Sequence, residues 1–266
     1  MPAKLCRKNE PESSAPCDLL VWDSAFWGFP VAQVRGNHLT MELAEAIDYW
    51  CAAHQVACLY FLATSDDPGT VRSAEDAAFR LVDTRISGVI TAERFSLLVP
   101  VVPRPALAIR HATPDDLPTL QRLAAASFLT TRFYFDENFP RARCGELYAQ
   151  WVADSVRRAS DVVLVAEGPE GLTGYVSIQH SPDAPRAQFG LLNVTPGARR
   201  QGIAQELMRD GLAWCTARGI HEVVGVTQGR NIAVQAFNCR VGFITESCQL
   251  WYHKWYWLPG KRATNQ

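Results

Sequence analysis

The sequence contains no long apolar run and almost no net charge. No stretch approaches the ~20 consecutive apolar residues of a membrane-spanning helix, and residues 1–17 include no apolar segment of signal-peptide length. The chain carries 26 Lys and Arg residues against 27 Asp and Glu residues, a formal net charge of -1. Because polyanions are bound by an excess of positive charge, a general affinity for nucleic acid or for an anionic membrane has no support. We expect a cytoplasmic protein with neither of these as a partner.

The eight cysteines lack the spacing of a metal site. No two of them form a C-x-x-C pair, and several lie within apolar helical or strand patterns. Scattered buried thiols are typical of a reducing compartment, and a zinc site or a disulfide framework is the less favoured interpretation. We expect no metal.

The strongest functional signal lies between residues 189 and 219. An apolar strand over residues 189–194 leads through a Pro-Gly turn into a helix expected from about Gln201 to Gly219. Two arginines and a glycine stand where the first free backbone N–H groups of this helix point outward, an arrangement that favours anions. A surface turn without a ligand is the alternative. The pattern predicts a diphosphate site formed by Arg199, Arg200, Gln201, Gly202, Ile203 and Ala204.

The prolines of the segment VPVVPRPAL suggest a linker between two domains. Residues 18–102 predict a small α/β domain, residues 107–257 a second domain, residues 1–17 a disordered N-terminus and residues 258–266 a C-terminal tail. In the first domain we expect two short strands around residues 23–29, helices over residues 41–54 and 71–80, and strands over residues 57–63, 81–90 and 94–101.

The second domain alternates helices with strands. The expected helices cover residues 117–127, a segment from about Pro140, and a last helix that Asn231 caps and Gly242 ends. The expected strands are a hairpin over residues 161–166 and 172–179, a strand over residues 222–226 beside residues 189–194, and closing strands over residues 243–257.

The order of these motifs resembles the GNAT acetyltransferases. Arg199-x-x-Gly202-x-Ala204 is similar to their acyl-CoA pyrophosphate loop, and Asn231-x-x-Ala-x-x-Phe237 is similar to their next helix. The segments FWGFPVAQ, TRFYFDENFP and QLWYHKW look like one branch, the dTDP-fucosamine acetyltransferases, over nearly the whole chain. The resemblance implies an α/β (α+β) fold with a mixed, mainly antiparallel sheet flanked by helices, plus a smaller N-terminal α/β domain.

The resemblance also implies how acetyl-CoA is held. In the family, the strand before the loop bulges and splays from the next strand, and its free backbone groups pair with the pantetheine arm and face the thioester oxygen. Donors of this kind can be worth ~3 kcal/mol each. Asn231 matches a position that often contacts pantetheine, although helix capping alone would explain it. The corresponding strand positions in this sequence are Leu192, Asn193 and Val194.

Phe237 departs from the family pattern, which usually has Tyr at this position. The family hydroxyl protonates the leaving CoA thiolate, and Phe cannot do so. A general acid contributes roughly 10²- to 10⁴-fold in rate, whereas a thiolate with a reference pKa of about 8.5 is already a tolerable leaving group. We expect a slower reaction in which water, or less readily Tyr252, supplies the proton.

The residues on the amine side are less clearly marked. Asp136, Glu137 and His180 are candidates for a base or a substrate contact, and each is more simply a solvated surface residue. Arg132 and Tyr134, in an aromatic loop, are better placed to meet a nucleotide-sugar diphosphate and its ring, although loop packing explains them equally well.

These features predict an acetyl-CoA-dependent N-acetyltransferase that acts on the amino group of a nucleotide-linked amino-deoxy-sugar by direct attack in a ternary complex. The partner is then a small nucleotide-sugar, and assembly into a homodimer is left open. A GNAT enzyme with another small amine or a protein as acceptor is one alternative. A non-catalytic acyl-CoA-binding module, suggested by Phe237, is the other.

Overall fold

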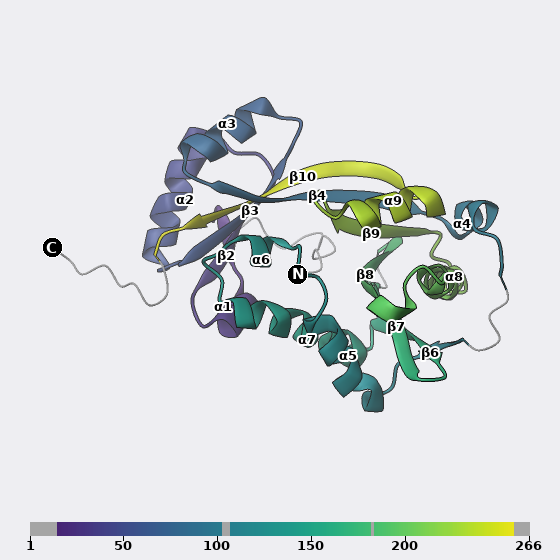
Figure 1. Ribbon diagram of the computed structural model, residues 1–266. Helices are drawn as coiled ribbons and strands as arrows, with labels where there is room; N and C mark the ends of the chain where they lie inside the picture. Colours follow the sequence, from purple (N-terminus) through teal and green to yellow (C-terminus); the bar gives the residue numbers. More distant parts are fainter. Residues whose placement is uncertain (1–14, 103–106, 182–183, 258–266) are drawn as a thin grey trace.

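The computed structural model describes residues 15–102, 107–181 and 184–257, in which ten strands form one sheet with helices on both faces (Figure 1). Seven of the strand pairs are antiparallel, and two, β2–β3 and β8–β9, are parallel, so the expected mixed, mainly antiparallel sheet is confirmed. In sheet order the strands are β1 (Cys17–Leu19), β2 (Val31–Val34), β3 (Cys58–Thr64), β10 (Ile244–Trp255), β4 (Arg80–Ile90), β9 (Glu222–Gln228), β8 (Arg186–Val194), β7 (Gly171–Gln179), β6 (Asp161–Gly168) and β5 (Ala108–His111).

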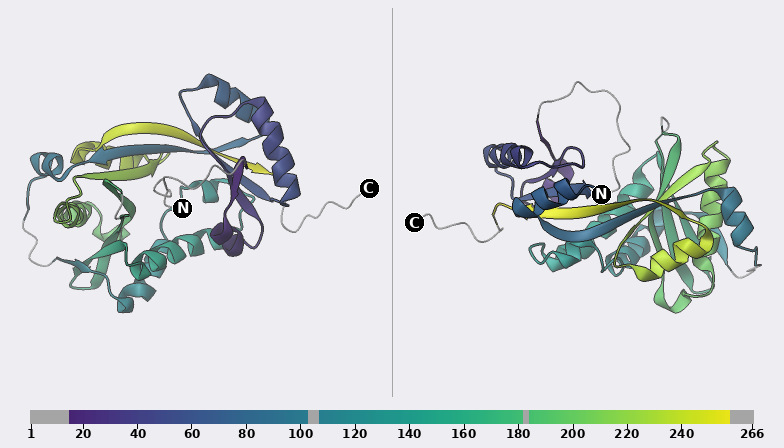
Figure 2. Two further views of the ribbon diagram at one scale, coloured as in Figure 1. Left: turned by 180° about the vertical axis from the view of Figure 1, so that it is seen from behind. Right: turned by 90° about the horizontal axis from the view of Figure 1, so that it is seen from above.

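Two long strands connect the first and last parts of the sequence. β10 pairs with β3 on one edge and with β4 on the other, from Ile244 opposite Val89 to His253 opposite Arg80. Figure 2 shows this pair from behind and from above. It crosses from the end of the molecule with α2 (Met41–Ala53) and α3 (Pro68–Asp76) to the end with α4 (Ala92–Leu98) and α9 (Ile232–Val241). The sheet is thus continuous across the expected domain boundary. Residues 103–106 of the linker lie outside the described residues, as do residues 1–14 and 258–266, and the division into two domains stays a prediction.

Three apolar clusters attach the helices to the sheet. On one face, α2 (Met41–Ala53) and α3 (Pro68–Asp76) cover β3 and β10, and α8 (Ile203–Thr216) covers β6, β7 and β8. On the other face lie α1 (Val21–Trp27), α5 (Leu117–Ala125), the short α6 (Arg132–Phe135) and α7 (Arg141–Arg157). No helix among the described residues is long and apolar enough to cross a membrane.

Local capping explains several of the helix starts. The Thr40 hydroxyl accepts from the N–H of Leu43 at 3.2 Å, and α2 then buries Ala44, Ile47 and Cys51 at helical spacing. The helix predicted over residues 71–80 begins earlier, at Pro68, because the Asp67 carboxylate accepts from the N–H of Gly69 at 2.9 Å.

Residues 23–29, for which the sequence predicted no helix, lie largely in α1 (Val21–Trp27). β1 and β2 flank it as expected, but α1 occupies the space between them. Gly28 ends α1 in the left-handed conformation, with φ 81°, and its N–H donates to the Ser24 carbonyl. The Ser24 hydroxyl also donates to Leu20 O at 2.7 Å, which stabilises the first turn of α1.

The strand predicted over residues 94–101 is wrong, because α4 (Ala92–Leu98) and a short extension occupy this segment. The Thr91 hydroxyl accepts from the N–H of Arg94 at 3.2 Å and starts the helix. Of the helix residues only Phe95 is buried, so a short apolar run was mistaken for a strand. The closing region also differs from the prediction in being the single strand β10.

Candidate active site at the β8–β9 splay

The predicted diphosphate loop is exposed and strained. Arg200 has φ 65° and Gly202, the residue before α8, has φ 78°, so both lie in the left-handed region. This conformation is costly for a residue with a Cβ and concentrates at ligand-binding turns. The Arg199 and Arg200 side chains are exposed, and within the described residues no hydrogen bond is made by the backbone N–H groups of residues 200–204.

β8 bulges and separates from β9 just before this loop. β8 and β9 pair from Arg186 opposite Glu222 to Phe189 opposite Gly225, and within the described residues the pairing ends there, although β9 continues to Gln228. The register of the β7–β8 pair also shifts, between Val176 and Ile178 of β7. The bulge is stabilised by the buried Ser177 hydroxyl, which accepts from the N–H of Leu191 at 2.8 Å.

This geometry leaves one edge of residues 190–194 without a strand partner in the described part of the chain. On their other edge, Leu192, Asn193 and Val194 pair with β7. Free strand N–H and C=O groups need partners, so this edge can bind an extended ligand as an added strand would.

Phe237 and Asn231 belong to α9 (Ile232–Val241), which follows β9. The half-buried Phe237 ring packs against the apolar cluster beneath α8. The Asn231 side chain caps α9 by accepting from the N–H of Val234 at 3.3 Å. The capping explanation for Asn231 is therefore present in the structure, and a pantetheine contact stays a prediction.

Tyr252 does not lie beside Phe237. Its side chain is only 1% exposed and packs in the cluster between β10 and the helices α2 and α3, with its ring 6.3 Å from that of Phe61. Phe237 contacts a different cluster. The suggestion that Tyr252 replaces the family acid is corrected by this placement.

Asp136 was expected at the solvated surface and is instead buried, at 8% exposed. Its carboxylate accepts from His253 Nδ1 at 2.7 Å and from Trp255 Nε1 at 2.9 Å. Burial alone would raise the pKa of Asp136, but these hydrogen bonds outweigh it and the net pKa is lowered. Sequence reasoning missed His253 because it lies 117 residues away on β10.

His253 connects Asp136 to Arg132. Burial lowers the pKa of His253 to about 4, although Asp136 opposes this shift, so the imidazole is neutral near pH 7. With Nδ1–H donating to Asp136, Nε2 accepts from Arg132 Nη1 at 3.3 Å. Asp136, His253 and Arg132 thus form a chain of two hydrogen bonds on one face of the sheet.

Arg132 is held in an aromatic cage. Its Cζ atom lies 3.9 Å from the ring centre of Trp251, 4.3 Å from that of Tyr60 and 4.5 Å from that of Phe133. Such contacts are more favourable when the cation is desolvated, and Arg132 is only 6% exposed. The segment predicted as a loop therefore fixes Arg132 through the short helix α6.

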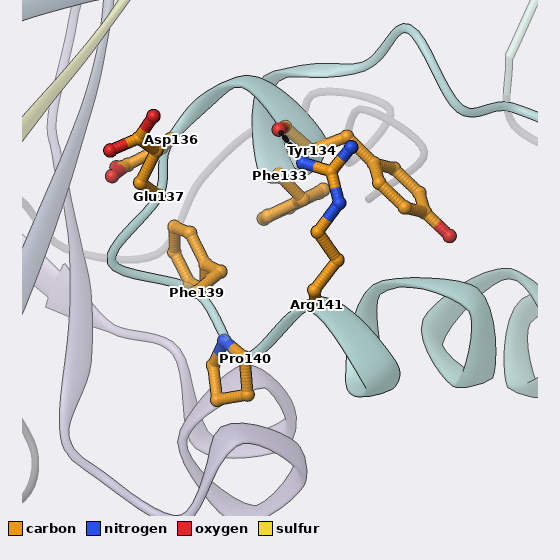
Figure 3. A pocket seen from close by; sticks show the side chains of 7 residues that line it. All are labelled: Phe133, Tyr134, Asp136, Glu137, Phe139, Pro140 and Arg141. Atoms are coloured by element: carbon orange, nitrogen blue, oxygen red, sulfur yellow. Dashed lines mark hydrogen bonds between the residues drawn. The ribbon is translucent and has the colours of Figure 1, made fainter.

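Tyr134 lines a pocket of about 420 Å³ formed by α6, the α6–α7 connection and the first residue of α7. Figure 3 shows Asp136 and Glu137 pointing to one side of this turn and Tyr134 to the other, with Arg141 donating from Nη1 to the Tyr134 carbonyl at 3.0 Å. No residue of β8 or of the diphosphate loop lines this pocket. Glu137 is exposed, and His180 is half-buried just after β7.

The structure holds no candidate metal cluster in the ranges it describes: no three His, Cys, Asp or Glu side chains are grouped to bind an ion.

The sequence and the fold were compared with known proteins. A family model described as an acetyltransferase (GNAT) domain matches residues 106–244. The dTDP-fucosamine acetyltransferase of Escherichia coli O6:H1 is 27% identical over 243 residues, which cover 90% of this chain and 98% of that protein. The spore coat polysaccharide biosynthesis protein SpsD of Bacillus subtilis is 26% identical over 150 residues, 56% of this chain and 50% of that protein.

Solved structures show the same fold at low sequence identity. A functionally unknown conserved protein from Staphylococcus epidermidis has a TM-score of 0.67 at 14% identity, over 92% of this chain and 93% of its own. A GCN5-related N-acetyltransferase from Kribbella flavida has a TM-score of 0.61 at 12% identity, over 94% and 89%. The family match spans more than half of the sequence and includes the bulged strand with its loop, and the chain therefore belongs to the GNAT family of N-acetyltransferases.

Proposed function

We propose that the protein transfers the acetyl group of acetyl-CoA to the amino group of a nucleotide-linked amino-deoxy-sugar, by direct attack within a ternary complex. The observation that supports this most strongly is the free edge of residues 190–194 leading directly into a loop with left-handed Arg200 and Gly202. A thioester bound along that edge has backbone donors beside it. For a diphosphate the loop has N–H groups, Arg200 and the terminal nitrogens of Arg199, whose Nε donates to the Val194 carbonyl at 3.1 Å.

In this proposal each part of the chain has a distinct role. The loop of residues 199–204 holds the CoA diphosphate, the backbone of Leu192, Asn193 and Val194 orients the pantetheine arm and the thioester, and Asn231 adds a side-chain contact. Phe237 provides an apolar wall and no proton, so water protonates the departing thiolate.

Two observations support the proposed acceptor. One is the similarity to the Escherichia coli protein, and the other is the position of Arg132 on the face of the sheet opposite α8. The Escherichia coli protein that aligns over 90% of this chain is a dTDP-fucosamine acetyltransferase, which favours a nucleotide-linked amino-sugar over a peptide. Arg132, which the sequence pointed to as a diphosphate contact, is a caged cation on that face. Tyr134, in the neighbouring pocket, is the second residue proposed to meet the acceptor.

Release of free CoA tests the proposal. Acetyl-CoA is incubated with a panel of dTDP-4-amino-4,6-dideoxy-sugars, and a simple aliphatic amine and a peptide serve as controls. CoA release that depends on a sugar supports the proposal. Release with the peptide or the aliphatic amine alone would assign another acceptor, and binding of acetyl-CoA without turnover on any amine would point to the non-catalytic module that Phe237 suggests.

A further inference from the structure

A half-buried arginine on the face opposite α8, Arg85, has no carboxylate partner among the described residues. Arg85 lies in the middle of β4, between Gln249 of β10 and Gln228 of β9. Its one side-chain hydrogen bond within the described ranges is a long one, from Nη1 to Gln249 Oε1 at 3.4 Å. Arg132 lies over the ring of Trp251, two residues from Gln249 on β10, so both arginines lie beside the same stretch of this strand. Burial lowers the pKa of Arg85, and the charge of Arg132 lowers it further.

The neighbouring carboxylates are already engaged. Asp83, two residues along the same face of β4, lies 3.6 Å from Arg230 Nε and accepts from the N–H of Thr84 at 2.9 Å. Asp136 accepts from His253 and Trp255. Within the described residues, neither Arg85 nor Arg132 forms a salt bridge, and the side-chain hydrogen bonds of these two arginines go to Gln249 and His253. A buried charge without a partner is costly unless a ligand provides the counter-charge.

The guanidinium of Arg132 is held in place before any ligand arrives. Its ring cage fixes its plane, and His253, itself oriented by Asp136, fixes one nitrogen. Within the described chain, Nη1 is the only Arg132 side-chain nitrogen with a hydrogen-bond partner. Donors held in this way bind an anion without a large cost in side-chain entropy.

The pair also lies at a suitable distance from the reaction centre. Arg85 is opposite Gln228 at the end of β9, and β9 is the strand from which β8 separates. Neighbouring strands are about 4.8 Å apart and β8 has separated from β9 at this level, so Arg85 lies more than roughly 10 Å from β8 across the sheet. One sugar ring with its phosphate can span such a gap, which would bring the amine of the sugar to the splay.

We propose that Arg85 and Arg132 form an anion subsite that binds the phosphate or diphosphate of the acceptor, with His253 and Asp136 as positioning residues. This assignment rests on the proposed function, because it takes the acceptor to be a nucleotide-sugar. It places the acceptor anion on the face of the sheet opposite the CoA diphosphate loop.

Binding of dTDP and of inorganic pyrophosphate to the CoA-saturated protein tests the subsite, because bound CoA blocks the first diphosphate site. Calorimetry compares the wild type with Arg85→Gln, Arg85→Lys and the control Arg122→Gln, which changes an exposed arginine on α5. We expect Arg85→Gln to weaken both ligands roughly 10- to 100-fold, as for loss of a charge-assisted hydrogen bond, with partial recovery in Arg85→Lys and no change in Arg122→Gln.

Affinity for CoA reports whether each variant is folded. If Arg85→Gln also loses CoA, Arg85→Leu replaces it, since an apolar residue removes the buried charge without leaving an unpaired polar group. Equal dTDP affinity in the wild type and in the folded Arg85 variant, or no binding of either anion by the wild type, would overturn the subsite. Failure of the sugar panel in the CoA-release assay, with anion binding still lost in Arg85→Gln, would instead count against the proposed function alone.

Discussion

The two faces of the sheet at the β8–β9 splay are built in opposite ways. On the α8 side, the proposed CoA site is a continuous segment, residues 192–204, that offers backbone N–H groups and exposed arginines. On the other side, the proposed acceptor site is assembled from side chains of β4, α6 and β10, and its arginines are buried or half-buried.

This difference reflects what each ligand demands. Backbone donors at a helix start bind any diphosphate, and their exposure lets a large, extended cofactor enter and leave. Side chains fixed by long-range contacts can discriminate between acceptors, because a ligand without the matching anion leaves buried cations unpaired. We infer that the α8 face provides the common chemistry and the opposite face the specificity.

The variant with the largest expected effect tests the ligand sites on the two faces of the sheet separately. Gly202→Glu should abolish detectable CoA binding, a loss of more than about 100-fold, because Gly202 has φ 78° and the new carboxylate would face the diphosphate. Binding of pyrophosphate at the Arg85 subsite should persist. Calorimetry with each ligand measures both effects.

Gly219→Glu is the matched control for this variant. Gly219 lies just beyond the other end of α8, has φ 73°, and a Cβ added there meets nothing within 4 Å. The same charge and the same backbone strain should therefore leave CoA affinity unchanged. Unchanged CoA affinity in Gly202→Glu would contradict the diphosphate site.

The sequence was informative where the site is local. The strand, the turn and the helix around Gly202 are contiguous, so their pattern was visible before the structure. The acceptor face could not be recognised from the sequence. Arg132 and His253 are 121 residues apart and come together only because β10 pairs with β3 and β4. Arg85, a single cation within a strand, gave no signal at all. The same lack of long-range information made Asp136 look like a surface residue.

A second prediction concerns the stability of the acceptor face. His253 has an ordinary pKa near 6.5 when unfolded and about 4 when folded, so the unfolded chain binds the extra proton between these values. The free energy of unfolding should therefore fall as the pH drops from about 6.5 to 4, with a contribution of up to about 3 kcal/mol from this residue. Urea titrations at several pH values measure it.

His253→Gln should flatten this part of the pH dependence, because glutamine does not titrate. His221→Gln, at an exposed position, should leave the profile as in the wild type. An identical fall in stability in the His253→Gln protein would show that the acidic loss arises elsewhere.

The smallest expected effect is at Phe237. Phe237→Tyr should raise the turnover number less than about tenfold, since a new acid assists a leaving group that already departs as a thiolate. The KM for acetyl-CoA should stay the same. Phe237→Leu, which changes the ring without adding a hydroxyl, should give no increase. A large loss of turnover in Phe237→Tyr would mean that the Phe237 ring packs directly against a ligand.

The central claim is that two diphosphates bind on opposite faces of the sheet and that the substrates meet through the splay. A crystal structure of the protein with both CoA and dTDP bound tests it most directly. The account predicts the CoA diphosphate at the N–H groups of residues 200–204 and the dTDP diphosphate within hydrogen-bonding distance of Arg85 and Arg132. A dTDP molecule on the α8 face, or away from both arginines, would contradict it.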